Sequence, residues 1–242
     1  MSGNSRLFLT AQWRNLVMLN YEVDRGLLAR YVPAMTELDS FEGRTYVSLV
    51  GFCFNKTRLL GRLAVPFHAD FEEVNLRFYV RRKAGGEDRR GVCFIAEIVP
   101  RRAIAWVARL VFGENYLRFP MEHRIEGDAD NGMVAYNWRV GDRKCRLFLE
   151  AAGEPLVVGQ GSLEQFITEH YWGYSRQRSG GCVEYRVAHQ PWRVAVATNA
   201  GFEGDPTATY GPAFATVLRG KPESAFLADG SSVEVFAGEK IA

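Results

Sequence analysis

One run of ten residues, Phe71 to Val80, carries the most chemically informative side chains in the sequence. Polar and apolar residues alternate in it, which is typical of a β-strand with two different faces. The polar face would hold an acid, an amide, a base and a phenol in one row: Glu73, Asn75, Arg77 and Tyr79. This row could line a cavity, with the acid and the base as partners, or it could form a charged ladder facing solvent.

A second concentration of reactive side chains lies between Thr168 and Tyr174. It contains one acid, one imidazole, one indole and two phenols: Glu169, His170, Trp172, Tyr171 and Tyr174. Aromatic rings with a polar tip are common in small-molecule pockets. The alternative is an amphipathic helix that packs its rings on a sheet. A capping box at Ser162 to Gln165 opens that helix, and we expect it to continue through this segment.

His189 ends a strand-like run just before Pro191, where it could act as an acid, a base or a ligand, or be structural. The other histidines are His68, His123 and His170, and no His-x-x-x-His or His-Glu-x-x-His spacing occurs. We therefore expect no metal. No phosphate-binding or dinucleotide-binding glycine motif is present, and we expect no cofactor.

The composition excludes several classes of function. A net charge of +2 gives no general attraction to nucleic acid or to membranes. Only five of the 30 basic residues are lysines, so few amines are available for imine chemistry. The four cysteines lack metal or redox spacing, and the N-terminus lacks the features of a signal peptide. These features predict a cytoplasmic protein with reduced thiols.

Strand-like runs recur along the chain and are separated by glycine-containing turns. The predicted strands are Trp13 to Tyr21, Arg44 to Phe54, Glu73 to Val80, Gly91 to Val99, Glu122 to Ile125, Met133 to Val140, Cys145 to Leu149, Cys182 to Ala188, Arg193 to Ala197 and Ser232 to Phe236. The predicted helices are Arg25 to Val32, Ala103 to Phe112 and one that opens at Ser162. This pattern indicates a single domain over residues 1–242, mostly antiparallel β, as a barrel or sandwich with helices at its edges.

Six segments follow one another in a distinctive order. They are Asp39 to Val50, the Glu73 strand, Gly91 to Phe94, Trp106 to Arg109 leading to Tyr116, Thr168 to Tyr174, and His189 to Trp192. In this order they resemble the YqjF-like proteins, the family of the domain of unknown function 2071, over residues 8 to 237. That family is similar to acetoacetate decarboxylase. The resemblance implies a mostly β (α+β) fold, an acetoacetate decarboxylase-like antiparallel β-barrel or cone with a few short peripheral helices and a central cavity.

The resemblance does not extend to the known reaction. Acetoacetate decarboxylases use a lysine to form an imine with the keto acid. The comparable stretch here, Phe112 to Pro120, contains no lysine. Arg118 cannot replace it, because a guanidinium stays charged at any working pH. The nearest lysines, Lys83 and Lys144, lie in predicted hairpin turns, so Schiff-base decarboxylation is not supported.

The leading hypothesis is a cavity for a small carboxylate or carbonyl compound, in an acid/base enzyme without a Schiff-base lysine. Glu73 or Glu169 would be the acid or base, because an apolar cavity raises the pKa of a carboxyl. Arg77, together with Arg109 or Arg118, would hold an anionic group. The residues expected to orient the ligand are Asn75, Tyr171, Tyr174 and His189.

Two further hypotheses stay open. A non-catalytic ligand sensor or carrier would keep the cavity without the chemistry, and a structural module would have an ordinary filled core. For any of them we expect no nucleic-acid or membrane partner, and a homodimer through an exposed strand edge is plausible.

Overall fold

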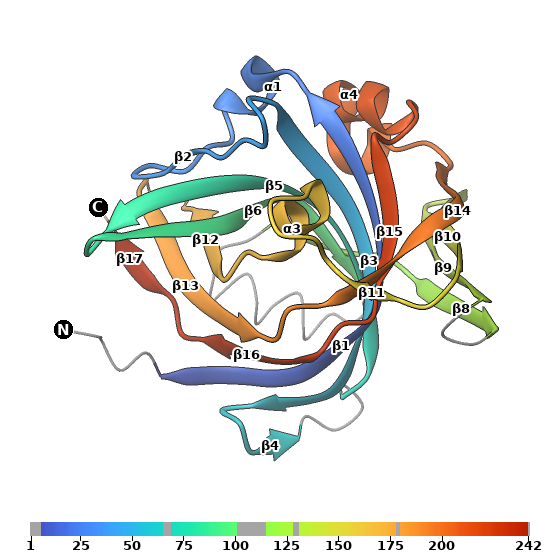
Figure 1. The fold of residues 1–242 in the computed structure, drawn as a ribbon, viewed down its shortest axis with the longest axis horizontal. Helices are drawn as coiled ribbons and strands as arrows, with labels where there is room; N and C mark the ends of the chain where they lie inside the picture. The colour runs from blue at the N-terminus through green and yellow to red at the C-terminus, as the bar shows by residue number, and fades with distance from the viewer. Residues whose placement is uncertain (1–5, 65–68, 101–114, 128–130, 178–179, 242) are drawn as a thin grey trace.

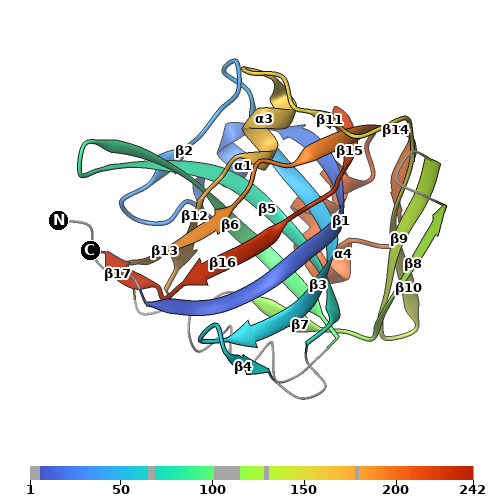
Figure 2. The same ribbon diagram turned by 60° about the horizontal axis from the view of Figure 1, so that its bottom comes forward.

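The structure is a computed structural model that describes residues 6–64, 69–100, 115–127, 131–177 and 180–241. Paired strands form a ring (Figures 1 and 2). The ring strands are β1 (Leu7–Val23), β3 (Thr45–Leu59), β5 (Phe71–Ala84), β6 (Glu87–Val99), β12 (Trp172–Arg176), β13 (Cys182–His189) and β16 (Ser232–Phe236). Each pairs with the next in this order, and β16 pairs back with β1. The mostly β, cone-like architecture that the resemblance implies is therefore present.

A second antiparallel layer packs against the outside of this ring, at the right of Figure 2. Its strands are β8 (Met121–Gly127), β9 (Asn131–Val140), β10 (Arg143–Ala152) and β14 (Arg193–Glu203). β14 also pairs with β15 (Ser224–Ala228), which pairs with β1, so the layer is continuous with the ring. The short strands are β2 (Glu37–Leu38), β4 (Leu63–Ala64), β7 (Tyr116–Arg118), β11 (Leu156–Val157) and β17 (Glu239–Ile241).

The described helices are short. They are α1 (Arg25–Ala29), α3 (Leu163–Thr168) and α4 (Thr207–Leu218). The oxygen of Ser162 accepts a hydrogen bond from the backbone N–H of Gln165 at 3.2 Å, so α3 begins where the capping box predicts. In Figure 1, α3 lies across one end of the ring. No helix in the described ranges is long and apolar enough to span a membrane.

All ten predicted strands overlap observed strands, but the helix predictions were less accurate. The helix from Ser162 stops at Thr168 instead of continuing through Tyr174, because Trp172 joins β12 and pairs with Gly91 of β6. α4 was missed, since Gly211 and Pro212 interrupt its pattern; Gly211 has a φ of 79°. The predicted helix Ala103 to Phe112 lies outside the described residues.

Between Glu73 and Val80, strand β5 has no face in solvent. Its apolar side chains belong to an outer core that β9, β10 and α4 cover: Val74, Leu76, Phe78 and Val80. Its polar side chains are also buried, but they point to the interior of the ring: Glu73, Asn75, Arg77 and Tyr79. The interpretation of this row as a solvent-facing ladder is therefore wrong.

A β-bulge changes which residues of β6 face the interior. Leu76 of β5 is opposite Ala96, but Arg77 is opposite Phe94, so Ile95 is the extra residue. Phe94, which precedes the bulge, lines the interior, and Glu97, which follows it, lines the interior as well. A regular alternation would instead have turned Ala96 inward and Glu97 outward.

Gly51 of β3 allows the second layer to approach the ring closely. A Cβ at this position would lie 2.5 Å from Cδ2 of Tyr136 and 2.9 Å from Cδ2 of Leu147. The hydroxyl of Tyr136 donates a hydrogen bond to the backbone oxygen of Asn15 at 2.9 Å. The missing side chain thus lets one aromatic ring join two layers.

We expect Gly51→Ala to lower the free energy of unfolding by about 1–3 kcal/mol, because the added methyl group overpacks this contact. Urea denaturation of the two proteins measures the difference. Gly159→Ala is the control, since its Cβ would meet only Cβ of Ser162 at 3.9 Å. Equal stability of the Gly51 variant and the parent would show that the layers separate easily at this point.

Candidate functional site

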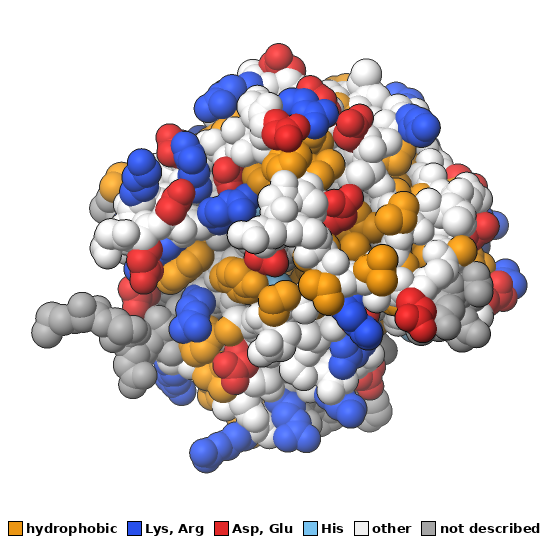
Figure 3. All heavy atoms as spheres, in the orientation of Figure 1, with side chains coloured by type: hydrophobic (Ala, Val, Ile, Leu, Met, Phe, Trp, Pro, Cys, Tyr) orange, Lys and Arg blue, Asp and Glu red, His pale blue; other side chains and the backbone are white. Residues whose placement is uncertain are grey.

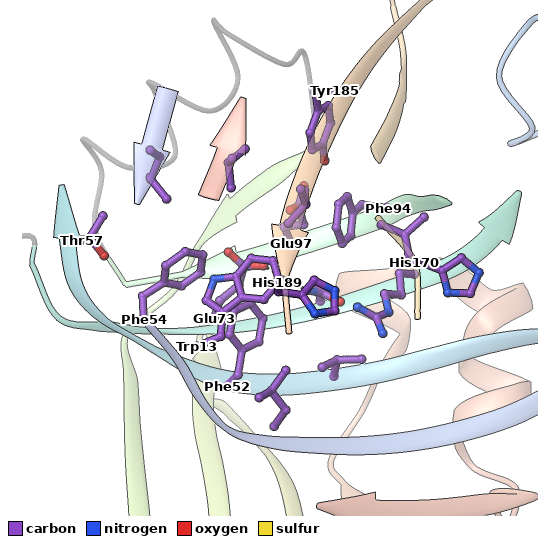
Figure 4. A pocket seen from close by; sticks show the side chains of 18 of the residues that line it. Trp13, Phe52, Phe54, Thr57, Glu73, Phe94, Glu97, His170, Tyr185 and His189 are labelled. Carbon is purple, nitrogen blue, oxygen red and sulfur yellow. Dashed lines mark hydrogen bonds between the residues drawn. The ribbon is translucent and has the colours of Figure 1, made fainter. Parts of the chain in front are cut away.

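A cavity of about 180 Å³ lies inside the ring (Figure 4). Aromatic side chains form much of its wall, and hydrophobic side chains also gather near the centre of the face in Figure 3. The apolar lining is interrupted by acidic, basic, amide and imidazole side chains, which are Glu73, Asn75, Arg77, Glu97, His170 and His189. Four of them were candidate site residues in the sequence, whereas Glu97 was missed and His170 was only part of a dense segment.

Glu73 is the most chemically distinctive of these groups, with a relative exposure of 3%. The amide nitrogen of Asn75 donates to Oε1 of Glu73 at 3.0 Å, and the hydroxyl of Tyr116 donates to Oε2 at 3.4 Å. Burial raises the pKa of Glu73 to about 7, against the opposing effects of these two hydrogen bonds and the charge of Arg77. At neutral pH this carboxyl can therefore either give or accept a proton.

Arg77 occupies the other end of the polar row. Its Nη2 donates to the backbone oxygen of Ile167 at 3.1 Å, which ties β5 to the end of α3. Its Nε has no hydrogen-bond partner within the described part of the chain. Four residues of strand span roughly 13 Å, and no ion pair joins Arg77 to Glu73 among the described contacts. The acid and the base are therefore not in direct contact, although the charge of Arg77 acts to lower the pKa of Glu73.

Glu97 adds a second acid to the same wall, with a relative exposure of 1%. It is opposite Asn75 in the pairing of β5 with β6. Glu73 is therefore a diagonal neighbour, at a separation that cross-strand side chains can bridge. One sequence signal was available, since Glu97 is an acid in an otherwise apolar strand.

His170 is buried between the polar row and a surface ion pair. Its Nε2 is 3.8 Å from Oδ2 of Asp39, and Asp39 accepts a hydrogen bond from Nε of Arg90 at 2.7 Å. Burial lowers the pKa of His170 to about 4, with Arg90 and Arg77 adding to the effect and Asp39 opposing it. Neither ring nitrogen has a hydrogen-bond partner among the described residues. A neutral imidazole is thus available to a ligand or to water.

His189 lies between Trp13 and His170 in Figure 4. Its Nδ1 donates to the backbone oxygen of Gln190 at 2.9 Å, and its ring stacks on that of Trp192 with centroids 4.4 Å apart. Burial lowers its pKa. These contacts fix the ring as part of the aromatic wall.

Three other predicted site residues, Glu169, Tyr171 and Arg118, lie outside this cavity lining. Glu169 is partly exposed and accepts a hydrogen bond from Gln165 at 3.1 Å. Tyr171 packs behind His189, with ring centroids 4.8 Å apart. Arg118 is exposed on β7. Arg109 is outside the described residues.

Tyr174 belongs to a separate buried cluster. Its hydroxyl donates to Oε1 of Glu184 at 3.0 Å. Arg82 and Arg89 also bind Glu184, at 2.9 and 2.7 Å. These two arginines fasten the β5–β6 hairpin to β13.

The five lysines, Lys56, Lys83, Lys144, Lys221 and Lys240, are all described and exposed, and none lines the cavity. No cluster of three or more metal-ligating side chains occurs in the described ranges. The cavity therefore offers proton transfer and anion binding from its own side chains, without an amine for imine formation.

Similar folds occur in acetoacetate decarboxylase-like proteins. Acetoacetate decarboxylase from Legionella pneumophila is 14% identical with a TM-score of 0.68, covering 97% of this chain and 87% of that chain. An acetoacetate decarboxylase-like enzyme from Sphingomonas wittichii is 12% identical with a TM-score of 0.67, covering 97% and 93%. The enduracididine biosynthesis enzyme MppR, complexed with pyruvate, is 13% identical with a TM-score of 0.65, covering 100% and 93%. The fold class is therefore acetoacetate decarboxylase-like.

The chain belongs to the DUF2071 family, described as an uncharacterized conserved protein, which matches residues 10–232. It is 27% identical to the uncharacterized protein YqjF of Bacillus subtilis over 183 residues, which are 74% of this chain and 72% of that protein. The suspected family relationship is confirmed.

The raised pKa of Glu73 predicts a pH-dependent effect of Glu73→Gln on stability. The folded state holds this proton more tightly than the unfolded state, in which the pKa is near 4.5. Parent stability therefore decreases from about pH 4.5 to about pH 7 relative to the variant, by roughly 3 kcal/mol in total. Urea denaturation of both proteins between pH 4 and pH 8 measures the difference.

Glu234→Gln is the control for this experiment, because Glu234 is an exposed glutamate on β16, away from the cavity. A stability difference between Glu73→Gln and the parent that stays constant over this pH range would contradict the assigned protonation.

Proposed function

We propose that the protein binds a small carboxylate or carbonyl compound in its cavity and catalyses proton transfer at a carbon next to the carbonyl. The observation that carries this proposal is the placement of Glu73, a buried carboxyl on the cavity wall with a pKa of about 7. General bases with a pKa near the working pH are the most effective.

The roles follow from position on β5. Arg77 holds the carboxylate of the substrate, since its Nε is buried without a partner in the described structure. Asn75 lies between the two and fixes Glu73 through its 3.0 Å hydrogen bond. Glu73 accepts the proton from the C–H bond, the electron pair moves to the carbonyl oxygen as an enolate forms, and Glu73 returns the proton.

The similar structures support the substrate class. MppR, which has a similar fold, has been solved in complex with pyruvate, a small 2-oxo acid. A cytosolic location is consistent with four cysteines that are all buried and free of disulfides. A small-molecule ligand, with no nucleic acid or membrane, completes the proposal.

A non-catalytic ligand carrier is the second candidate. Every lysine of this chain is exposed, so none is placed to form an imine as in an acetoacetate decarboxylase. The absence of this chemistry favours a carrier. Only turnover distinguishes this candidate from the first.

Deuterium exchange tests the proposed chemistry. We expect the protein to exchange the C3 protons of pyruvate or 2-oxobutanoate with D₂O, observed by ¹H NMR, and Glu73→Gln to slow this by about 10²-fold or more. Glu72→Gln is the control, because Glu72 is on the same strand and binds His123 at 2.6 Å outside the cavity. Binding of the acids without exchange would establish the carrier instead.

Borohydride trapping tests the exclusion of imine chemistry. We expect pyruvate and sodium borohydride to leave the protein mass unchanged under conditions that label a Schiff-base enzyme completely, because no lysine lines the cavity. Intact-protein mass spectrometry measures this. A stoichiometric adduct on one lysine would contradict the mechanism.

A further inference from the structure

The cation and the aromatic rings of the cavity lie toward opposite ends of the polar row on β5. Arg77 is opposite Ser48 in the pairing with β3, and Ile167 and His170 lie at this end. Glu73 is opposite Phe52, and Phe71 is opposite Phe54. One end of the cavity therefore offers a cation, and the other offers aromatic rings beside the carboxyl of Glu73.

The aromatic end is a set of rings packed edge to face. Trp13 is central to it, with ring centroids 5.3 Å from Phe52, 5.8 Å from Phe54 and 6.2 Å from Trp192. Trp13, Phe52 and Phe54 lie together with Glu73 in Figure 4. These rings are held by one another, so they form a preorganised apolar wall.

The volume exceeds what a three-carbon acid needs. A cavity of about 150 Å³ lined by apolar side chains accommodates benzene. The 180 Å³ here therefore accommodates a ring together with a short carboxylate chain. The roughly 13 Å between the Cα atoms of Glu73 and Arg77 leaves room for such a molecule along the row.

We infer that the natural ligand is an aryl-substituted short-chain carboxylate, whose carboxylate binds Arg77 and His170 and whose ring packs against Trp13. This inference rests on the anion site of the proposed function, and it specifies the substituent that the acid carries. The buried Nε of Arg77 is a donor without a partner among the described residues, and the neutral ring of His170 adds one N–H donor. With its aryl group against Trp13 and its carboxylate on Arg77, the ligand has the carbons between these two groups beside Asn75 and Glu73.

Isothermal titration calorimetry with matched probes tests the inference. We expect 3-phenylpropionate to bind at least about 10-fold more tightly than propionate, because the ring leaves water for an apolar wall. Arg77→Gln is expected to weaken 3-phenylpropionate at least about 10-fold and to leave 2-phenylethanol, which lacks the carboxylate, unchanged. Arg81→Gln is the control, since Arg81 makes an exposed ion pair with Glu37 at 2.9 Å.

Trp13→Ala is expected to change which aryl acid the protein prefers, a result that a merely unfolded variant would not give. The larger cavity is expected to reverse the preference of the parent, so that 2-naphthylacetate binds more tightly than 3-phenylpropionate. Equal affinity for propionate and 3-phenylpropionate, or equal weakening of both aryl acids by Trp13→Ala, would overturn the inference. If that result came with Glu73-dependent proton exchange of pyruvate, the proposed function would stand and only the aryl-acid inference would fall. If aryl acids bound but no proton exchange occurred, the ligand class would stand and only the proposed chemistry would fall.

Discussion

The burial of β5 on both faces is the constraint on which the cavity depends. Its apolar face is covered by the second layer, so its polar face must turn toward the interior of the ring. A buried acid and a buried base are costly unless their polar atoms find partners. Asn75 and Tyr116 supply partners for Glu73, and the backbone of Ile167 supplies one for Arg77. The remaining donors define the places where a ligand fits.

The same constraint explains the protonation pattern of the site. Removal from water favours the neutral forms of both acids and imidazoles, and it moves their pKa values in opposite directions. Glu73 rises to about 7, while His170 falls to about 4. At neutral pH the wall therefore carries a neutral imidazole and a carboxyl that is close to its titration point. Arg77 is the cation that remains to attract an anion.

Much of the fold was predictable because strand periodicity is a local signal. The Glu73 strand and the β9–β10 hairpin at Gly141 follow directly from alternation and turn residues. Whether Glu73 faced solvent was not predictable from its own strand, because the answer depends on a layer that is distant in sequence. Glu97 was missed because the bulge at Ile95 reverses the alternation. The end of α3 was missed because the pairing of Trp172 with β6 is a tertiary contact.

The bulge in β6 also has a consequence for how such a protein diverges. Substitution at Glu97 would change one cavity group, whereas deletion of the single residue Ile95 would remove the bulge and leave Phe94 and Glu97 facing the interior, with Ala96 still facing the outer core. The bulge therefore absorbs one extra residue, and the wall stays acidic whether or not the strand carries that residue. A relative that lacks only this extra residue therefore keeps the same side chains on the cavity wall, so a difference in length at the bulge does not by itself imply a different ligand.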